Sequence, residues 1–135
     1  KVINEKVIGK NISAIIVDIH CEATSEKMAI AHEFDGKTSL IVGTHTHIPT
    51  ADARILLNGT AYISDLGMCG DYNSIIGMDK KKSLERFKKK TPVRGIHPAT
   101  GEASLSSVFV ELDEKTGLAK SIKQIIMGGC LKEIS

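Results

Sequence analysis

Apolar residues form two nearly unbroken runs, at residues 13–20 and 40–44, with a segment of helical spacing between them. Runs of this length without alternation are typical of strands that are covered on both faces in a parallel sheet. A helix is the usual connection between neighbouring parallel strands. The pattern therefore predicts a strand, a helix and a parallel strand over residues 13–44, and an α/β fold class.

The helix of this unit is expected from about residue 25 to 35. Thr24 or Ser25 can accept hydrogen bonds from the free N–H groups of its first turn, and Gly36 suits the left-handed residue that ends a helix. The apolar positions share one side of the helix, which we expect to be buried. These positions are Met28, Ala31, Phe34 and Ile30.

Two hairpins are predicted further along the chain. Asn58-Gly59 separates apolar runs at residues 54–57 and 60–64, and this dipeptide is the strongest short-range signal for a tight hairpin turn. The alternating residues 106–112 and the run 118–127 flank a loop with turn chemistry. The second pair predicts an antiparallel hairpin at the C-terminal end.

The remaining segments are predicted to be a helix end, a loop and one further helix. Apolar positions near the start of the chain have helical spacing and stop at Gly9. Residues 65–78 contain three glycines and little periodicity, which is typical of a loop that borders a site. Asp79 can cap a helix of about residues 80 to 90. Its expected buried side chains are Leu84 and Phe87.

Composition narrows the classes of function. The 135 residues are the length of one ordinary domain, and 41% hydrophobic with 25% charged residues is typical of a globular protein. A formal net charge of +2 gives no electrostatic argument for a nucleic acid or an anionic membrane as the main partner. Three widely spaced cysteines predict neither a disulfide framework nor a zinc knuckle. The cysteines fit a reducing compartment best, no apolar run approaches the ~18 residues of a membrane span, and no segment resembles a signal peptide, so we expect a cytoplasmic protein.

Three histidines lie where strands of the predicted sheet end. His45 and His47 follow the second strand two residues apart, so on an extended chain both imidazoles point the same way, and His20 ends the first strand. The carboxyl ends of parallel strands form one edge of an α/β sheet, so these strand ends should converge there. Imidazoles bind Zn, Mn, Fe or Ni without any cysteine. The pattern predicts a metal site, with polar residues that bind nothing as the alternative.

Three polar residues near these strand ends are further candidates. Asp18 precedes His20 by two residues and can face the same way, although a carboxylate tied to backbone N–H groups explains it equally well. Asp65, at the end of another strand, is a plausible partner for a histidine N–H. Thr46, between the paired histidines, is a candidate to lie beside the metal ligands or the substrate. We assign no role to His32, His97, Cys21 or Cys69.

Four segments together carry a resemblance to a known family. They are Asp18 to Lys27, Val42 to His47, Thr50 to Leu56 and Gly59 to Met68. In this order, with Gly77-Met78 and the closing hairpin, they resemble the bacterial YmdB-like metallophosphoesterases over nearly the whole chain. The resemblance covers only the second half of that family.

The resemblance implies a fold and a set of ligands. The fold is an α/β sandwich with mixed sheets flanked by helices and ending in an antiparallel hairpin, and residues 1–135 would form the C-terminal part of this single domain. Two divalent metal ions, Fe, Mn or Zn, would lie in it. His20 and His45 would bind one ion and His47 the other. The family's first half supplies an Asp ligand, a bridging Glu, an Asn ligand and an Asn-His pair near the phosphate, none of which is found in this sequence.

Three interpretations of function therefore stay open. The resemblance implies a metallophosphoesterase that hydrolyses 2′,3′-cyclic nucleotides or related phosphoesters once the missing N-terminal half is present. A catalytically incomplete binding or regulatory module with the same fold is the second. A mononuclear zinc hydrolase with three histidine ligands and an open fourth position is the third. We expect no membrane partner, and association of the chain with further copies of itself remains open.

Overall fold

The centre of the protein is a four-stranded sheet, seen in a computed structural model that describes residues 2–5, 7–89, 92 and 94–135. The spatial order of its strands is β1 (Ile16–His20), β2 (Leu40–Thr44), β4 (Ala61–Ile63) and β3 (Arg54–Ile55). The strands β1, β2 and β4 are parallel, and β3 is antiparallel to β4. This mixed arrangement confirms the predicted α/β class.

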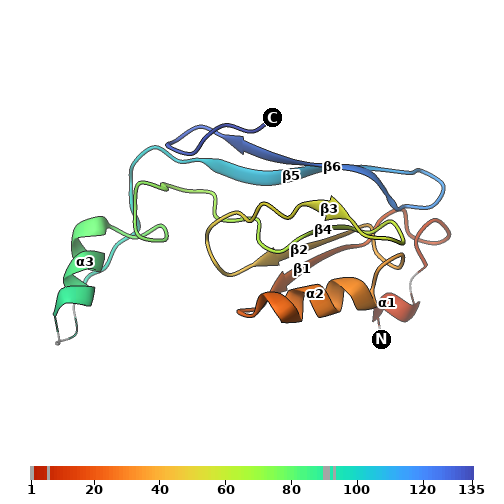
Figure 1. Ribbon diagram of the computed structural model, residues 1–135, viewed down its shortest axis with the longest axis horizontal. Coiled ribbons are helices and arrows are strands. Elements are labelled where there is room, and N and C mark those ends of the chain that lie inside the picture. The colour runs from red at the N-terminus through yellow and green to blue at the C-terminus, as the bar shows by residue number, and fades with distance from the viewer. Residues whose placement is uncertain (1, 6, 90–91, 93) are drawn as a thin grey trace.

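The sheet has a helix along one side and a hairpin along the other (Figure 1). The helix is α2 (Thr24–Glu33), and the hairpin consists of β5 (Leu105–Leu112) and β6 (Ala119–Met127). Side chains of α2 and the sheet form a buried cluster of Ile19, Ala31, Ile41, Leu56 and Tyr62. The predicted strand–helix–strand unit and the terminal hairpin are both confirmed.

The predicted turns coincide with glycines in the left-handed region. Gly36 has a φ of 79° just beyond α2, and Gly59 has a φ of 99° in the turn between β3 and β4. The short helix α1 (Val2–Glu5) ends before Gly9, whose φ is 75°. Glycine adopts this conformation without the steric cost that a Cβ atom brings. The glycines therefore mark the predicted turns, although α2 already ends at Glu33, before the predicted position of about residue 35.

The expectation that the first strand is covered on both faces was wrong. Strand β1 begins at Ile16 rather than at residue 13, and Ile16 is 67% exposed. In the described part of the chain β1 lies at the edge of the sheet and pairs only with β2. An apolar run indicates which residues can be buried, but it does not indicate whether a neighbouring strand is present to bury them.

Two details of α2 also differ from the prediction. Its N-cap is Ala23, which makes no side-chain capping bond, so neither predicted capping residue caps it. Met28 is 36% exposed, whereas Lys27 is only 1% exposed and takes the expected place of Met28 on the buried side. Hydrophobic spacing did not predict this because a lysine is buried only where a specific partner compensates its charge.

Helix α3 (Lys80–Lys88) begins as predicted, because the Asp79 side chain accepts a hydrogen bond from the Lys82 N–H at 3.0 Å. The expected buried side was wrong: Leu84 is 45% exposed and Phe87 is 80% exposed. Figure 1 shows the reason, since α3 extends away from the sheet and the hairpin. Position 90, the predicted end of the helix, lies outside the described residues.

No described helix has both the length and the apolar character that crossing a membrane requires.

Gly43, in the last part of β2, allows two other segments to approach the sheet closely. A Cβ atom at this position would lie 1.8 Å from the Ser64 carbonyl oxygen and 2.8 Å from Lys27 Cδ. The Gly43 carbonyl also accepts a hydrogen bond from the Leu66 N–H at 2.9 Å. The absence of a side chain therefore lets the chain after β4 and the stem of Lys27 pack directly against β2.

We predict that Gly43→Ala lowers the free energy of unfolding by about 3 kcal/mol or more, because backbone atoms must move to admit the methyl group. Gly70→Ala is the matched control, since its Cβ atom would lie 3.9 Å from the nearest atom, Met68 Sδ. The control should change stability by less than about 1 kcal/mol. Urea unfolding followed by circular dichroism measures both, and equal effects would contradict the prediction.

Candidate metal centre

The candidate site begins where two parallel strands end side by side. His20 and Thr44 are the last residues of β1 and β2 and are paired in register, and His45 follows directly. The Nε2 atom of His20 lies 3.3 Å from the Nδ1 atom of His45, and the two rings meet edge to face at an interplanar angle of 73°. Both residues are exposed to solvent. The structure thus brings together two of the three predicted ligands.

The separation of these two nitrogens fits a shared metal ion. Zinc binds imidazole nitrogen at about 2.0–2.1 Å in tetrahedral geometry, so two ligands of one ion lie about 3.3–3.4 Å apart. His20 Nε2 and His45 Nδ1 already have a separation of 3.3 Å. The arrangement therefore suits a borderline divalent cation such as zinc.

The other ring nitrogen of His20 is held by a short chain of polar groups. Its Nδ1 atom lies 3.2 Å from Thr44 Oγ1, and the Thr44 hydroxyl donates to Asp18 Oδ1 at 3.3 Å. A hydroxyl that donates to the carboxylate can accept the Nδ1–H proton, which leaves Nε2 with its lone pair. Asp18 thus contacts His20 only through Thr44, a residue that the sequence did not single out although it lies opposite His20 in the sheet.

His47 is held by a different segment. Its Nδ1 atom donates a hydrogen bond to the Ile76 carbonyl oxygen at 2.9 Å. Over the residues that the structure describes, no group of three or more His, Cys, Asp and Glu side chains is placed to hold one metal ion. The three imidazoles therefore do not form one cluster. The pair His20/His45 and the single His47 occupy separate positions around the strand ends.

Asp65 fixes the backbone of the histidine loop. Its Oδ2 atom accepts the Thr46 N–H at 2.8 Å, and its Oδ1 atom accepts the Gly67 N–H at 2.9 Å. The Thr46 hydroxyl donates a hydrogen bond to the carbonyl of Ile48, two residues further along the loop, at 2.8 Å. Asp65 thus bonds to the peptide between the two histidines rather than to a ring, and Thr46 stabilises the loop itself.

Asp65 also forms a buried ion pair with Lys27. Lys27 Nζ lies 3.0 Å from Asp65 Oδ2, and the two side chains are 2% and 1% exposed. Burial alone would raise the pKa of Asp65. The hydrogen bonds from the N–H groups of Thr46 and Gly67 and from Lys27 outweigh this effect and hold the pKa below its ordinary value. The carboxylate is therefore charged at neutral pH and keeps its bonds to the loop.

A second carboxylate organises the chain that follows the loop. Asp52 accepts hydrogen bonds from the hydroxyls of Thr50 and Ser64 at 2.7 and 2.5 Å, and it forms an ion pair with Arg54 at 3.1 Å. Burial raises the pKa of Asp52, but these hydrogen bonds, those from Ser64 first, lower it overall. Through these contacts Asp52 fixes Thr50 before it and Arg54 after it, in the segment that joins the histidines to β3.

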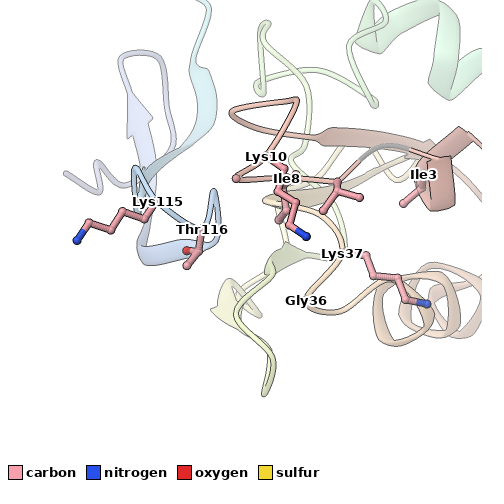
Figure 2. A pocket seen from close by; sticks show the side chains of 9 residues that line it. Ile3, Ile8, Lys10, Gly36, Lys37, Lys115 and Thr116 are labelled. Atoms are coloured by element: carbon pink, nitrogen blue, oxygen red, sulfur yellow. The ribbon is translucent and has the colours of Figure 1, made fainter.

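A pocket of about 530 Å³ lies elsewhere in the protein (Figure 2). Its lining includes Lys10, Lys37 and Lys115 together with apolar residues of the first nine positions. Lys10 precedes β1 and Lys37 precedes β2, so the pocket adjoins the amino ends of these strands. Functional clefts of open α/β sheets lie at the carboxyl ends. The site is therefore assigned to the histidines and not to this pocket.

Sequence reasoning missed three residues around the site: Thr44, Lys27 and Ile76. The in-register position opposite His20 was a usable signal for Thr44. A lysine four residues before the buried Ala31 was a weaker signal for Lys27. Nothing in the sequence pattern indicated that the Ile76 carbonyl meets His47.

The chain is similar to a known protein family, to a curated relative and to two solved structures. A family model described as YmdB-like protein matches residues 1–125. A 2′,3′-cyclic-nucleotide 2′-phosphodiesterase of Bacillus subtilis is 48% identical over 119 residues, which cover 88% of this chain and 45% of that protein. A phosphatase from Mycoplasma pneumoniae has a TM-score of 0.82 at 37% identity, covering 94% of this chain and 44% of the other. A hypothetical protein from Thermus thermophilus has a TM-score of 0.83 at 37% identity, covering 95% of this chain and 48% of the other.

The fold and these neighbours define an α/β protein of a phosphatase-type fold. The chain belongs to the YmdB-like protein family, as its sequence segments predicted. It spans about half the length of these three proteins, between 44% and 48% of each.

We predict that Lys27→Met destabilises the fold by about 3–5 kcal/mol, because the Asp65 carboxylate stays buried without its cation. Lys37→Met is the matched control, since the Lys37–Glu33 pair is 50% and 71% exposed. An exposed pair of this kind contributes less than about 1 kcal/mol. Adding Asp65→Asn to Lys27→Met should restore part of the loss. Chemical unfolding compares the variants, and similar losses for Lys27→Met and Lys37→Met would contradict the assigned role.

The stability that Asp65 provides should also depend on pH. Its folded-state pKa lies below the unfolded value, so its contribution is complete above the unfolded pKa of about 3.9 and is lost as pH falls through the folded pKa. We predict a constant difference in unfolding free energy between wild type and Asp65→Asn at neutral pH. The difference should shrink below about pH 4. Urea titrations over a pH series measure it, and a gap that widens on acidification would contradict the sign.

Proposed function

We propose that the complete protein is a metal-dependent phosphodiesterase, acting on 2′,3′-cyclic nucleotides or related phosphoesters, and that this chain contributes His20, His45 and His47 as ligands of a two-metal site. The observation that carries the proposal is the 3.3 Å separation of His20 Nε2 and His45 Nδ1 at adjacent strand ends. Support comes from a relative that is named as a 2′,3′-cyclic-nucleotide 2′-phosphodiesterase.

The three histidines of this chain would bind two different ions, and neighbouring residues would orient them. His20 and His45 would hold one divalent ion, Fe, Mn or Zn, and His47 would hold the other. When bound, such a pair of ions polarises phosphate oxygens and provides an activated water. Thr44 and Asp18 orient the His20 ring, while Asp65 fixes the peptide between the other two ligands.

A two-metal site needs ligands beyond the three histidines of this chain. Three neutral imidazoles bring no negative charge, and two adjacent cations require carboxylates to neutralise them. The described residues form no group of three ligands on one ion. We therefore propose that residues 1–135 are the C-terminal part of one domain, and that an N-terminal half contributes the bridging carboxylate and the substrate-side Asn-His pair. The coding sequence before Lys1 should then encode a strand ending in Asp and an Asn-His pair.

The free cysteines indicate in which cellular compartment the protein is located. Cys21, Cys69 and Cys130 form no disulfide, and the last two are exposed. Exposed free thiols persist in a reducing environment. We propose a cytoplasmic location on this basis.

We predict that His45→Ala and His47→Ala each reduce hydrolysis of a 2′,3′-cyclic nucleotide by the complete protein by more than ~100-fold, which exceeds the usual effect of losing an outer partner of a metal ligand. The fold should stay intact because both side chains are exposed. His32→Ala, on the exposed side of α2, is the control and should keep wild-type turnover.

Bound metal is measured on the same samples by elemental analysis. Wild type should contain two equivalents and the ligand variants fewer. Wild-type turnover in either ligand variant would refute the proposed site.

A catalytically incomplete binding module is the second candidate. The observation that favours it is the lack of a three-ligand group in the described residues. The two candidates differ in a measurable way: one metal equivalent or none, without turnover of a phosphodiester by the complete protein, would favour the module. A mononuclear zinc hydrolase is not favoured, since its three ligands would have to meet on one ion, and no three candidate ligands among the described residues are placed to do so.

A further inference from the structure

Two left-handed residues that are not glycine meet beside the candidate site. His47 has a φ of 64° and Ile76 has a φ of 48°. A hydrogen bond of 2.9 Å joins His47 Nδ1 to the Ile76 carbonyl oxygen. Positive φ is uncommon for any residue with a Cβ atom, and for a β-branched residue such as isoleucine it is a genuine outlier. Outliers of this kind cluster at functional sites because the surrounding structure must enforce them.

Ile76 owes its conformation to a tight turn. Ile75 and Met78 exchange two backbone hydrogen bonds, each of 3.0 Å, and the enclosed Gly77 has a φ of 89°. Two enclosed residues with positive φ define a type I′ turn, whose first position favours asparagine, aspartate or glycine. The side chain does not explain an isoleucine here, because it is 52% exposed.

Hydrogen bonds on both sides hold the turn in place. The Gly77 N–H donates to Ser74 Oγ at 2.8 Å, and the Gly77 carbonyl accepts the Ala99 N–H at 2.8 Å. The peptide that carries the Ile76 carbonyl therefore has little freedom to rotate. The carbonyl is directed at His47 by the turn itself.

The bond assigns the proton of the His47 ring. A carbonyl oxygen only accepts hydrogen bonds, so Nδ1 must be the donor and Nε2 carries the lone pair. Imidazoles that bind metals almost always donate the other ring N–H to a carbonyl or carboxylate in this way.

We propose that the Ile75–Met78 turn is a positioning device for His47. Its Ile76 carbonyl holds the ring in the Nδ1–H tautomer and leaves Nε2 free for a divalent ion. The inference rests on the proposed function for the identity of that ion, but the tautomer itself is a property of the metal-free protein.

A different role for Ile76 would lie in its side chain, which is exposed and could touch a substrate. Two substitutions at this one position separate the roles, because both remove the side chain and both keep a carbonyl. Ile76→Gly permits positive φ, whereas Ile76→Pro fixes φ near about −65° and forbids the type I′ turn. Among the described residues the Ile76 N–H donates no hydrogen bond, so proline removes none.

The first measurement is the tautomer of His47 in the complete, metal-free protein labelled with ¹⁵N-histidine. Long-range proton–nitrogen NMR spectra at about pH 8.5, where free imidazole is neutral, distinguish the two tautomers. His47→Gln identifies the His47 signals. We expect the Nδ1–H form in wild type and in Ile76→Gly, and loss of this preference in Ile76→Pro.

The second measurement is calorimetric titration of the same proteins with Mn²⁺. Ile76→Gly should bind both equivalents as wild type does and should have a higher Tm, because the turn is no longer strained. Ile76→Pro should bind one equivalent about 10- to 100-fold more weakly, the usual effect of losing an outer partner of a ligand.

The outcomes separate this inference from the proposed function. An Nε2–H tautomer in wild type would overturn the inference even if the proline variant fails to fold. Equal loss of the tautomer in both Ile76 variants would overturn it as well. An Nδ1–H tautomer in a wild-type protein that binds no Mn²⁺ would support the positioning of His47 while refuting the two-metal site.

Discussion

The ion pair between Lys27 and Asp65 is the contact on which the histidine loop depends. Both side chains are at most 2% exposed, so Lys27 depends on Asp65 to compensate its charge, and Asp65 depends on Lys27 together with the N–H groups of Thr46 and Gly67. Asp65 in turn fixes the peptide at Thr46, because its carboxylate accepts a hydrogen bond from the Thr46 N–H at 2.8 Å. One buried pair therefore connects α2, the chain after β4 and the loop with two candidate ligands. A surface pair would not fix these elements so firmly, because water and salt weaken it.

The candidate ligands are oriented by groups that differ in kind. His20 contacts a hydroxyl and, beyond it, a carboxylate, whereas His47 contacts a backbone carbonyl. In each ring the nitrogen held by a partner is Nδ1, so Nε2 is the nitrogen that keeps its lone pair in both histidines. The common result is a pair of rings whose reactive nitrogens are set before any ligand arrives, which reduces the ordering that binding requires.

The sequence was sufficient for the strand–helix–strand unit, the two hairpins and part of the site. Apolar runs and glycines located the parallel strands and the turns, because backbone geometry limits where each can occur. The strand-end rule brought His20 and His45 together. Burial was less predictable: Lys27 is buried and Phe87 is exposed, since both depend on partners that local spacing does not reveal. The contact of His47 with Ile76 joins segments 29 residues apart and needs a φ that isoleucine rarely adopts.

The outer edge of β1 has a consequence for handling the protein. Within the described residues this edge carries backbone groups that pair with no strand, next to the largely exposed Ile16. An open, apolar strand edge is a template for strands of other molecules. A preparation of this chain by itself should thus be prone to edge-to-edge aggregation. A charged residue in place of Ile16 would oppose such pairing, because charged side chains on an edge strand keep other strands away. Substitution at this edge should therefore raise the solubility of the chain.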